Sequence, residues 1–352
     1  MSSSFQNRLN YLNGWKPPET WLKIITIDAH AAGEPLRIIL EGLPEIKGIT
    51  ILEKRKYMKE NLDHLRTALM FEPRGHADMY GAIITEPVNK DSDFGVLFLH
   101  NEGYSTMCGH GIIALTKVVV QTGMIKAIEP ITEIKIDTPA GLVTSFAKVK
   151  DGKVESVYFH NVPSFVLTTH QIVDVQGIGK VKYDIAFGGA FYAFVNADEL
   201  GIGMKEQNFS ELIEKGMAIK NAVMKSYPIK HPFEEDLNFL YGTIFYGKSH
   251  SKEVDSRNVC IFAEGEVDRS PTGTGVSARM ALHYAKGEIE LNQPMEFESI
   301  IGTKFTGSAY QVTKFGKYDA VIPKVEGNAY ITGRHEFVID PDDPLKDGFI
   351  LR

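Results

Sequence analysis

The sequence predicts an α/β protein of the α+β type, built as two similar domains that are rich in antiparallel strands and each hold a central helix. Three observations lead to this prediction. The chain has 352 residues, which is too long for one small core. Short strand-like runs are frequent while helix patterns are few, which favours antiparallel sheets over a doubly wound parallel sheet. Finally, a stretch in the first half of the chain is repeated in the second.

The strand and helix patterns are read from hydrophobic periodicity and turn residues. Strands are expected at 22–28, 81–87, 94–100, 133–139, 153–159, 189–195, 258–264, 318–324, 328–333 and 335–339, and helices at 57–70, 111–123, near 205–225 and at 275–287. We expect a first domain over 20–174 and a second over 175–335, with 336–352 packing back on the first.

The repeat relates "MCGHG" (107–111) to "SPTGTG" (270–275). A shift of 164 positions places Cys108 on Thr272 without a gap, since 272 − 108 = 164. The same shift superimposes Phe98 on Phe262, Gly109 on Gly273, Gly111 on Gly275, Gly123 on Gly287 and Ile125 on Ile289. Each half therefore predicts a strand, a loop, a helix and a closing glycine, the residue that favours the left-handed end of a helix. We interpret this as an internal duplication whose halves face each other across a ligand-binding cleft.

Composition and charge narrow the classes of function. The net charge of −7 argues against a nucleic-acid surface, and no apolar run is long enough to span a bilayer. The start of the sequence lacks a hydrophobic segment of the signal-peptide type, and two cysteines fit neither a disulfide framework nor a cysteine-based zinc site. We expect a cytoplasmic protein with no nucleic-acid or membrane partner.

The helix starts after Cys108 and Thr272 predict a site for a small anion. Unpaired amides of the first turn and the positive end of the helix dipole favour negative charge, and glycines let a ligand approach the backbone. Two facing helix starts could hold one carboxylate. A thiol at such a position is expected to have a lowered pKa, which suits removal of a proton from the carbon next to the bound carboxylate.

Other chemistries fit less well. A metal site at Cys108 and His110 would have two ligands where zinc needs three or four, so no metal is expected. The Gly-x-Ser-x-Gly pattern of serine hydrolases and the phosphate loop of the Walker type are absent. Cys260, in "RNVCIF", is interpreted as a small buried residue.

The stretches "HNEGYSTMCGHGIIA" (100–114) and "DRSPTGTGVSARMAL" (268–282) resemble the two active-site motifs of the proline racemase family, and the likeness extends over nearly the whole chain. The resemblance implies a diaminopimelate epimerase-like fold of two similar domains, with the active site in the cleft between them. It also implies a cofactor-independent enzyme and a homodimer. Racemases and epimerases of this family use two cysteines, one on each face of the α-carbon.

This chain departs from that pattern because Thr272 stands where the family has its second cysteine. A threonine hydroxyl does not deliver a proton as a thiol does, so inversion by two bases should fail. Threonine at this position resembles the trans-3-hydroxy-L-proline dehydratases, whose substrate can expel hydroxide instead. In trans-3-hydroxy-L-proline the α-hydrogen and the hydroxyl both lie opposite the carboxylate. We therefore expect Cys108 to remove the α-proton and the 3-hydroxyl to leave, giving Δ1-pyrroline-2-carboxylate.

By the same resemblance, Gly109, His110, Gly273 and Thr274 would bind the substrate carboxylate, and Asp268 its ring nitrogen. Thr272 either fills space or binds the substrate hydroxyl. Five further polar residues are equally compatible with buried structural roles and with substrate contact: His30, Glu34, Arg37, His76 and Asp78. Gly188, Gly189, Phe191 and Tyr192 are expected to pack closely at a strand start, and "NVPSF" (161–165) to form a structural turn. Two rival functions stay open, a proline or hydroxyproline racemase or epimerase and a non-catalytic proline-binding protein.

Overall fold

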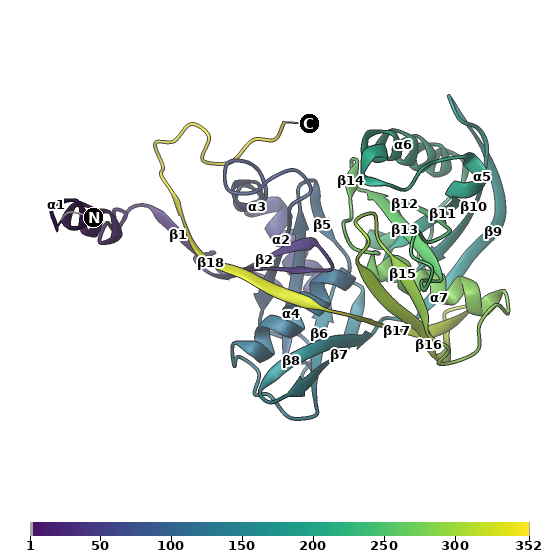
Figure 1. Ribbon diagram of the computed structural model, residues 1–352, viewed down its shortest axis with the longest axis horizontal. Coiled ribbons are helices and arrows are strands. Elements are labelled where there is room, and N and C mark those ends of the chain that lie inside the picture. The colour runs from purple at the N-terminus through teal and green to yellow at the C-terminus, as the bar shows by residue number, and fades with distance from the viewer. Residues whose placement is uncertain (1–2, 352) are drawn as a thin grey trace.

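The computed structural model describes residues 3–351 and has two lobes side by side (Figure 1). The first lobe holds the N-terminal half of the chain and the last strand. Its strands are β1 (Leu22–Ala31), β2 (Glu34–Glu41), β3 (Tyr80–Thr85), β4 (Phe94–His100), β5 (Gly103–Ser105), β6 (Ile131–Thr138), β7 (Gly141–Lys150), β8 (Lys153–His160) and β18 (Ala329–Ile339). Its helices are α2 (Ile51–Asn61), α3 (Asp63–Met70) and α4 (Gly109–Gln121).

The second lobe follows in the chain. Its strands are β9 (Ser164–Val175), β10 (Gly179–Phe187), β11 (Phe191–Asn196), β12 (Leu240–Gly247), β13 (Ser256–Phe262), β14 (Glu266–Val267), β15 (Met295–Glu298), β16 (Lys304–Phe315) and β17 (Tyr318–Gly327). Its helices are α5 (Ala197–Leu200), α6 (Phe209–Ser226) and α7 (Gly273–Ala285), with short 3₁₀ turns at Glu206–Asn208 and Glu235–Leu237. Most strand pairs in both lobes are antiparallel, so the expected α+β class is confirmed.

The lobes are joined by shared strand pairing. β17 pairs with β16 and β9 and also with β8 of the first lobe, while β18 pairs with β1 along its length. The tail beyond β18 returns to the first lobe, where Phe349 pairs with Glu72. The domain limits at 174 and 335 stay predictions. Because β9 pairs with β10 and all of β18 with β1, we propose that the lobes divide between β8 and β9 and between β17 and β18.

Each lobe wraps its strands around one buried helix. Helices α4 and α7 each contain 13 residues, and 11 of those in α4 and 10 of those in α7 are buried. Their bounds differ by the same 164 positions as the sequence repeat, since 273 − 109 and 285 − 121 both equal 164. Beyond each helix a glycine adopts the left-handed conformation, with φ of 82° at Gly123 and 69° at Gly287. The duplication thus describes real structural equivalence.

Two predicted elements differ from the structure. The single helix expected at 57–70 is two helices, because Leu62 leaves the helical conformation between α2 and α3 at φ −129° and ψ 16°. α2 also starts earlier than predicted, where the Thr50 hydroxyl accepts a hydrogen bond from the amide of Glu53. Conversely, the two strands expected at 328–333 and 335–339 are the single strand β18, since Gly333 pairs with Asp28 of β1.

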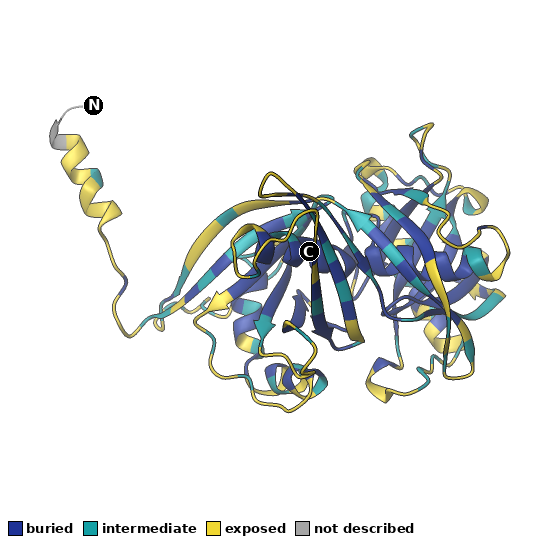
Figure 2. Cartoon of the chain, turned by 90° about the horizontal axis from the view of Figure 1, so that it is seen from below, coloured by how far each residue is buried: buried dark blue, intermediate teal, exposed yellow. Residues whose placement is uncertain are grey.

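The N-terminal helix α1 (Ser3–Asn13) projects away from both lobes, and nearly all of its residues from 5 to 13 are exposed (Figure 2). Along the outer strands, buried and exposed residues alternate (Figure 2), as expected for sheets with one face on a core. Across the described chain, no helix combines the length and the apolar character needed to cross a membrane.

Candidate active site

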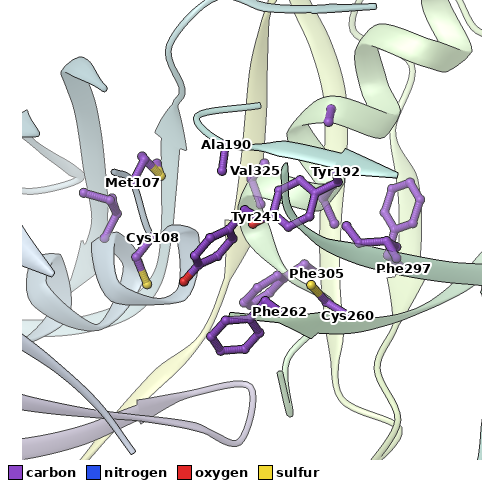
Figure 3. Packing of buried hydrophobic residues seen from close by; sticks show 14 of the residues in the cluster. Met107, Cys108, Ala190, Tyr192, Tyr241, Cys260, Phe262, Phe297, Phe305 and Val325 are labelled. Carbon is purple, nitrogen blue, oxygen red and sulfur yellow. The ribbon is translucent and has the colours of Figure 1, made fainter. Parts of the chain in front are cut away.

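A small cavity of about 20 Å³ lies where the starts of α4 and α7 meet. This cavity is lined by all seven site residues that were predicted from the sequence, so residues from both halves of the repeat come together there. The lining residues are Tyr80, Met107, Cys108, Gly109, His110, Tyr192, Tyr241, Cys260, Phe262, Asp268, Thr272, Gly273 and Thr274. Figure 3 shows Cys108 approaching from the first lobe, with Tyr241, Phe262 and Cys260 on the side of the second.

The two helix starts touch through glycine backbones. A Cβ atom built on Gly109 would lie 2.5 Å from the Cα of Gly273, and one built on Gly273 would lie 2.7 Å from the Cα of Gly109. No side chain fits at either position, since such distances are shorter than van der Waals contact. In an α-helix the first amides have no intrahelical acceptor, so those of Gly109, His110, Gly273 and Thr274 are available to a ligand. Both helix dipoles favour an anion here.

Cys108 caps the start of α4, where its Sγ accepts a hydrogen bond from the amide of Gly111 at 3.2 Å. The predicted lowering of its pKa is wrong for the ligand-free protein. Burial raises the pKa of the Cys108 thiol well above its usual range, while the Gly111 amide opposes this rise and the nearby Asp268 carboxylate adds to it. Removing the thiolate from water outweighs the favourable helix start.

His110 lies against the same thiol, with its Nδ1 3.2 Å from the Sγ of Cys108. Burial lowers the pKa of His110 to about 3, so the imidazole is neutral near pH 7 and brings no positive charge to the thiol. Its ring also meets the ring of Tyr80 edge-on, with centroids 4.8 Å apart. Among residues 3–351, no group of three or more His, Cys, Asp or Glu side chains is arranged to hold a metal ion.

Thr272 occupies the matching position before α7 but behaves differently from Cys108. Its backbone has φ 66° and ψ 93°, a left-handed conformation that threonine rarely adopts, and its side chain does not cap the helix. The hydroxyl is buried and lies close to Asp268 and Cys260, where its hydrogen bonding opposes the rise in pKa that burial causes in each group. It therefore adds a polar group to this wall of the cavity.

Asp268 lies on the Thr272 side of the cavity and is 5% exposed. Burial raises its pKa to about 6, opposed by hydrogen bonds from Ser270. One of these runs from the Ser270 amide to Oδ1 at 2.7 Å. A buried carboxylate is stabilised by a cationic ligand, such as a secondary ammonium.

Sequence reasoning missed the aromatic wall of the cavity. Tyr80, Tyr241 and Phe262 come from β3, β12 and β13, and Tyr80 and Tyr241 carry no local motif that separates them from ordinary strand aromatics. Tyr192, expected only to pack, holds Thr274 through a 2.7 Å hydrogen bond between their hydroxyls. The one signal for Tyr80 was its place in "GHADMYG", a stretch already singled out for His76 and Asp78.

Cys260 is fully buried in β13, as predicted, but it also lines the cavity. Its surroundings are therefore more polar than its strand suggested. Its carbonyl accepts a hydrogen bond from the amide of Asp268 at 3.1 Å. Burial raises the pKa of the Cys260 thiol well above its usual range, with a further rise from Asp268 and an opposing effect of the Thr272 hydroxyl.

The five additional polar residues do not line the cavity. Glu34 and Asp78 of the first lobe hold Arg269 of the second: Glu34 Oε2 accepts from the Arg269 amide at 2.7 Å, and the Asp78 carboxylate pairs with its guanidinium at 2.7 Å. Arg37 is structural, bound to Asp28 at 2.9 Å. The remaining two make local contacts: His30 Nδ1 accepts from the Gly33 amide, and His76 Nδ1 lies 2.7 Å from the Ala77 carbonyl.

The loop before β11 packs on the start of α7, as expected from its glycines. A Cβ on Gly188 would lie 2.2 Å from the carbonyl oxygen of Thr274. The "NVPSF" turn contributes to the same packing, because Asn161 Nδ2 donates to the Gly188 carbonyl at 2.7 Å and to Ser277 at 2.8 Å. These contacts fix the second helix start against its lobe.

The comparisons with known proteins agree with this geometry. The proline racemase family model matches residues 26–350. A protein of Colwellia psychrerythraea named trans-3-hydroxy-L-proline dehydratase is 50% identical, covering 96% of each chain. A human protein of the same name is also 50% identical, covering 93% of this chain and 94% of its own.

Among solved structures, a hydroxyproline epimerase from Agrobacterium vitis with bound trans-4-hydroxy-L-proline matches with a TM-score of 0.87. It is 30% identical in sequence and covers 94% of this chain and 96% of its own. The expected two-lobed, epimerase-like fold is thus confirmed over nearly the whole chain. The matches extend through both lobes and both helix starts, and the chain belongs to the proline racemase family.

Proposed function

We propose that this protein is a hydro-lyase that converts trans-3-hydroxy-L-proline into Δ1-pyrroline-2-carboxylate and water. The observation that carries the proposal is the pairing of Cys108 and Thr272 across one cavity, a thiol on one wall and a hydroxyl on the other. The relatives named as trans-3-hydroxy-L-proline dehydratases support the same reaction.

The carboxylate of the substrate binds between the helix starts. The amides of Gly109 and His110 donate from α4, and those of Gly273 and Thr274 from α7. Because the four amides belong to two lobes, the ligand itself holds the lobes together around the reacting carbon. The backbone contact of Gly109 with Gly273 supports this arrangement, since it brings both sets of amides to one point.

The secondary ammonium of the substrate pairs with Asp268. This places positive charge beside a carboxylate that is costly to keep ionised alone. The same positive charge, next to the α-carbon, also favours the thiolate form of Cys108, which burial alone disfavours. Substrate binding and ionisation of the base thereby support each other.

Cys108 acts as the base and removes the α-proton. The negative charge that develops at the α-carbon is stabilised by the bound carboxylate and the adjacent ammonium, and it expels the 3-hydroxyl. The enamine product then tautomerises to the cyclic imine. Thr272 offers no thiol on the other wall to return a proton to the α-carbon, which favours elimination over inversion.

Three further properties belong to the proposal. The chain works without a cofactor, since each step uses a side chain or the substrate's own charges. The protein is cytoplasmic. Its two cysteines, Cys108 and Cys260, are free thiols, which supports this location because reducing compartments keep thiols unpaired. It assembles as a homodimer, as its membership of the family suggests.

The test is incubation of the purified protein with trans-3-hydroxy-L-proline and no added cofactor, following the cyclic imine by NMR. We expect imine from the wild type and none from Cys108→Ser. If the protein is instead a racemase or epimerase, no imine forms, and D-proline or the epimer of 4-hydroxyproline appears from the corresponding L-imino acids. Binding of L-proline with neither product indicates a non-catalytic binding protein.

A further inference from the structure

Two tyrosine hydroxyls meet beside Cys108, one from each lobe. Tyr80 is the first residue of β3 and Tyr241 is the second of β12, and their oxygens lie 3.4 Å apart. Figure 3 shows the hydroxyl of Tyr241 pointing toward Cys108. The hydroxyls of Tyr80 and Ser105 are also hydrogen-bonded to each other, which fixes the position of Tyr80. A polar pair therefore interrupts an otherwise aromatic wall.

The wall around this pair is buried and closely packed. Tyr80 and Tyr241 are 3% and 8% exposed, and the ring of Tyr241 stacks on Phe262 with centroids 5.3 Å apart. Phenylalanine would supply the same packing, so the two oxygens are the chemical feature that tyrosine adds. Burial raises the pKa of both hydroxyls well above the ordinary value for tyrosine, so both are protonated near pH 7.

The stereochemistry of the proposed substrate decides which wall receives its hydroxyl. This step rests on the proposed function. In trans-3-hydroxy-L-proline the α-hydrogen and the 3-hydroxyl lie on the same ring face. With Cys108 removing the α-proton, the 3-hydroxyl must also face the Cys108 wall. Thr272 precedes the helix start of the other lobe, so it faces the opposite side of the ring.

We propose that the Tyr241 hydroxyl binds the 3-hydroxyl of the substrate and protonates it as it leaves, and that Tyr80 positions Tyr241 for this step. Tyr241 is then a catalytic residue, and Thr272 does not bind the departing 3-hydroxyl. The two tyrosines also give the cavity its preference for an imino acid with an oxygen at carbon 3, because a hydroxyl group buried without its partner is penalised.

The protons balance over one turnover. Cys108 thiolate takes the α-proton, the bond between carbon 3 and oxygen breaks, and Tyr241 gives its proton to the departing oxygen, forming water. Tyr241 recovers a proton from Tyr80, and Tyr80 recovers one from the Cys108 thiol, which restores the thiolate. Tyr80 is suitably placed, because against the effect of burial it lowers the pKa of the Cys108 thiol by hydrogen bonding. The α-proton thus leaves with the hydroxyl as water, and no external acid is consumed.

The experiment compares Tyr241→Phe with the wild type on two substrates that differ in the leaving group. With trans-3-hydroxy-L-proline we expect kcat to fall by about 10²-fold or more, the usual contribution of a general acid. With trans-3-fluoro-L-proline, whose fluoride leaves without a proton, we expect the loss to be within about threefold. Tyr80→Phe should give an intermediate loss with the first substrate and a smaller loss with the second, because it also removes the hydrogen bond that lowers the pKa of the Cys108 thiol.

The control is Tyr246→Phe, on the same strand β12 but outside the cavity, which should match the wild type on both substrates. Circular dichroism and competitive inhibition by L-proline report whether Tyr241→Phe folds and still binds an imino acid. An equal loss on both substrates would mean a structural role, and no loss on either would mean that Tyr241 is not the acid. Absence of imine from the wild type would overturn the proposed function itself, and this inference with it.

Discussion

Gly109 and Gly273 face each other across the two lobes at a distance that admits no side chain. A Cβ on the first would lie 2.5 Å from the Cα of the second. The contact joins the starts of the two repeated helices, so the geometry of the anion site depends on it. The site is therefore a property of how the lobes meet, and neither lobe can form it alone.

Gly109→Ala and Gly273→Ala should each push the lobes apart. Since overpacking a dense contact costs about 1–3 kcal/mol, we expect a loss of that size in the free energy of unfolding. Dehydration should fall by about 10²-fold or more, because amides that move by an ångström no longer hold the carboxylate. Gly123→Ala, at a solvent-open glycine after α4 with φ 82°, is the control for a loss of stability alone: its backbone strain should lower the free energy of unfolding and leave turnover unchanged. Chemical denaturation and imine formation measure the two effects, and normal turnover by either cleft variant would contradict the account.

Asp268 should make activity fall below about pH 6. Burial raises its pKa to about 6, and only the ionised form pairs with the substrate ammonium, so kcat/KM should decline as the pH drops through this value. A pH profile of kcat/KM for the wild type checks this expectation. A profile that stays flat down to about pH 5 would exclude Asp268 as the partner of the ammonium.

Stability should respond to Asp268 in the opposite sense. A folded pKa raised above the unfolded value contributes stability below about pH 4 that is lost as the pH rises through about 6. Asp268→Asn removes this cost and should stabilise the ligand-free protein at pH 7 by about 1–3 kcal/mol while abolishing activity. Asp319→Asn, at an 87% exposed side chain, should change neither. Thermal unfolding at pH 4.5 and 7.5 measures the difference, which should be smaller at the lower pH.

Cys108 should react slowly with iodoacetamide in the ligand-free protein at pH 7. Burial raises its pKa well above the usual range, so we expect alkylation at least about tenfold slower than that of free cysteine, accelerating as the pH rises. Mass spectrometry of the Cys260→Ser variant isolates the reaction at Cys108. Rapid alkylation at pH 7 would show that the helix start, and not burial, controls the thiol.

Thr272→Cys should restore a thiol on the second wall. We predict that this variant converts L-proline to D-proline at a measurable rate, whereas the wild type and Thr272→Ser do not. Chiral chromatography after prolonged incubation is the measurement. If the wild type already yields D-proline, the residue at position 272 does not decide between elimination and inversion.

Much of the fold could be predicted from the sequence because the duplicated segments have the same local pattern of apolar residues and glycines. A shift of 164 positions located both buried helices, their equal lengths and their closing glycines. The same pattern nominated Cys108 and Thr272, and the family resemblance added Asp268; the three residues share one cavity. Local patterns failed where an element is interrupted by a single residue, as at Leu62 between α2 and α3.

The remaining features depend on contacts between segments distant in the chain. Tyr80 and Tyr241 are 161 positions apart, and nothing in either strand indicates that their hydroxyls meet. The pKa of Cys108 illustrates the same limit, since the helix start was visible in the sequence but the burial that outweighs it was not. The side chains that would tune the reaction are therefore set by how the lobes pack.

The central claim is that one base, Cys108, acts on the ring face that also carries the departing hydroxyl. The most direct test compares trans-3-hydroxy-L-proline with cis-3-hydroxy-L-proline, each deuterated at the α-carbon, and follows imine formation by NMR. The account predicts imine with loss of deuterium from the trans isomer and a rate at least about 10²-fold lower from the cis isomer, whose hydroxyl faces the Thr272 wall. Comparable rates from the two isomers would contradict it, because the leaving group would then need no partner on the Cys108 side.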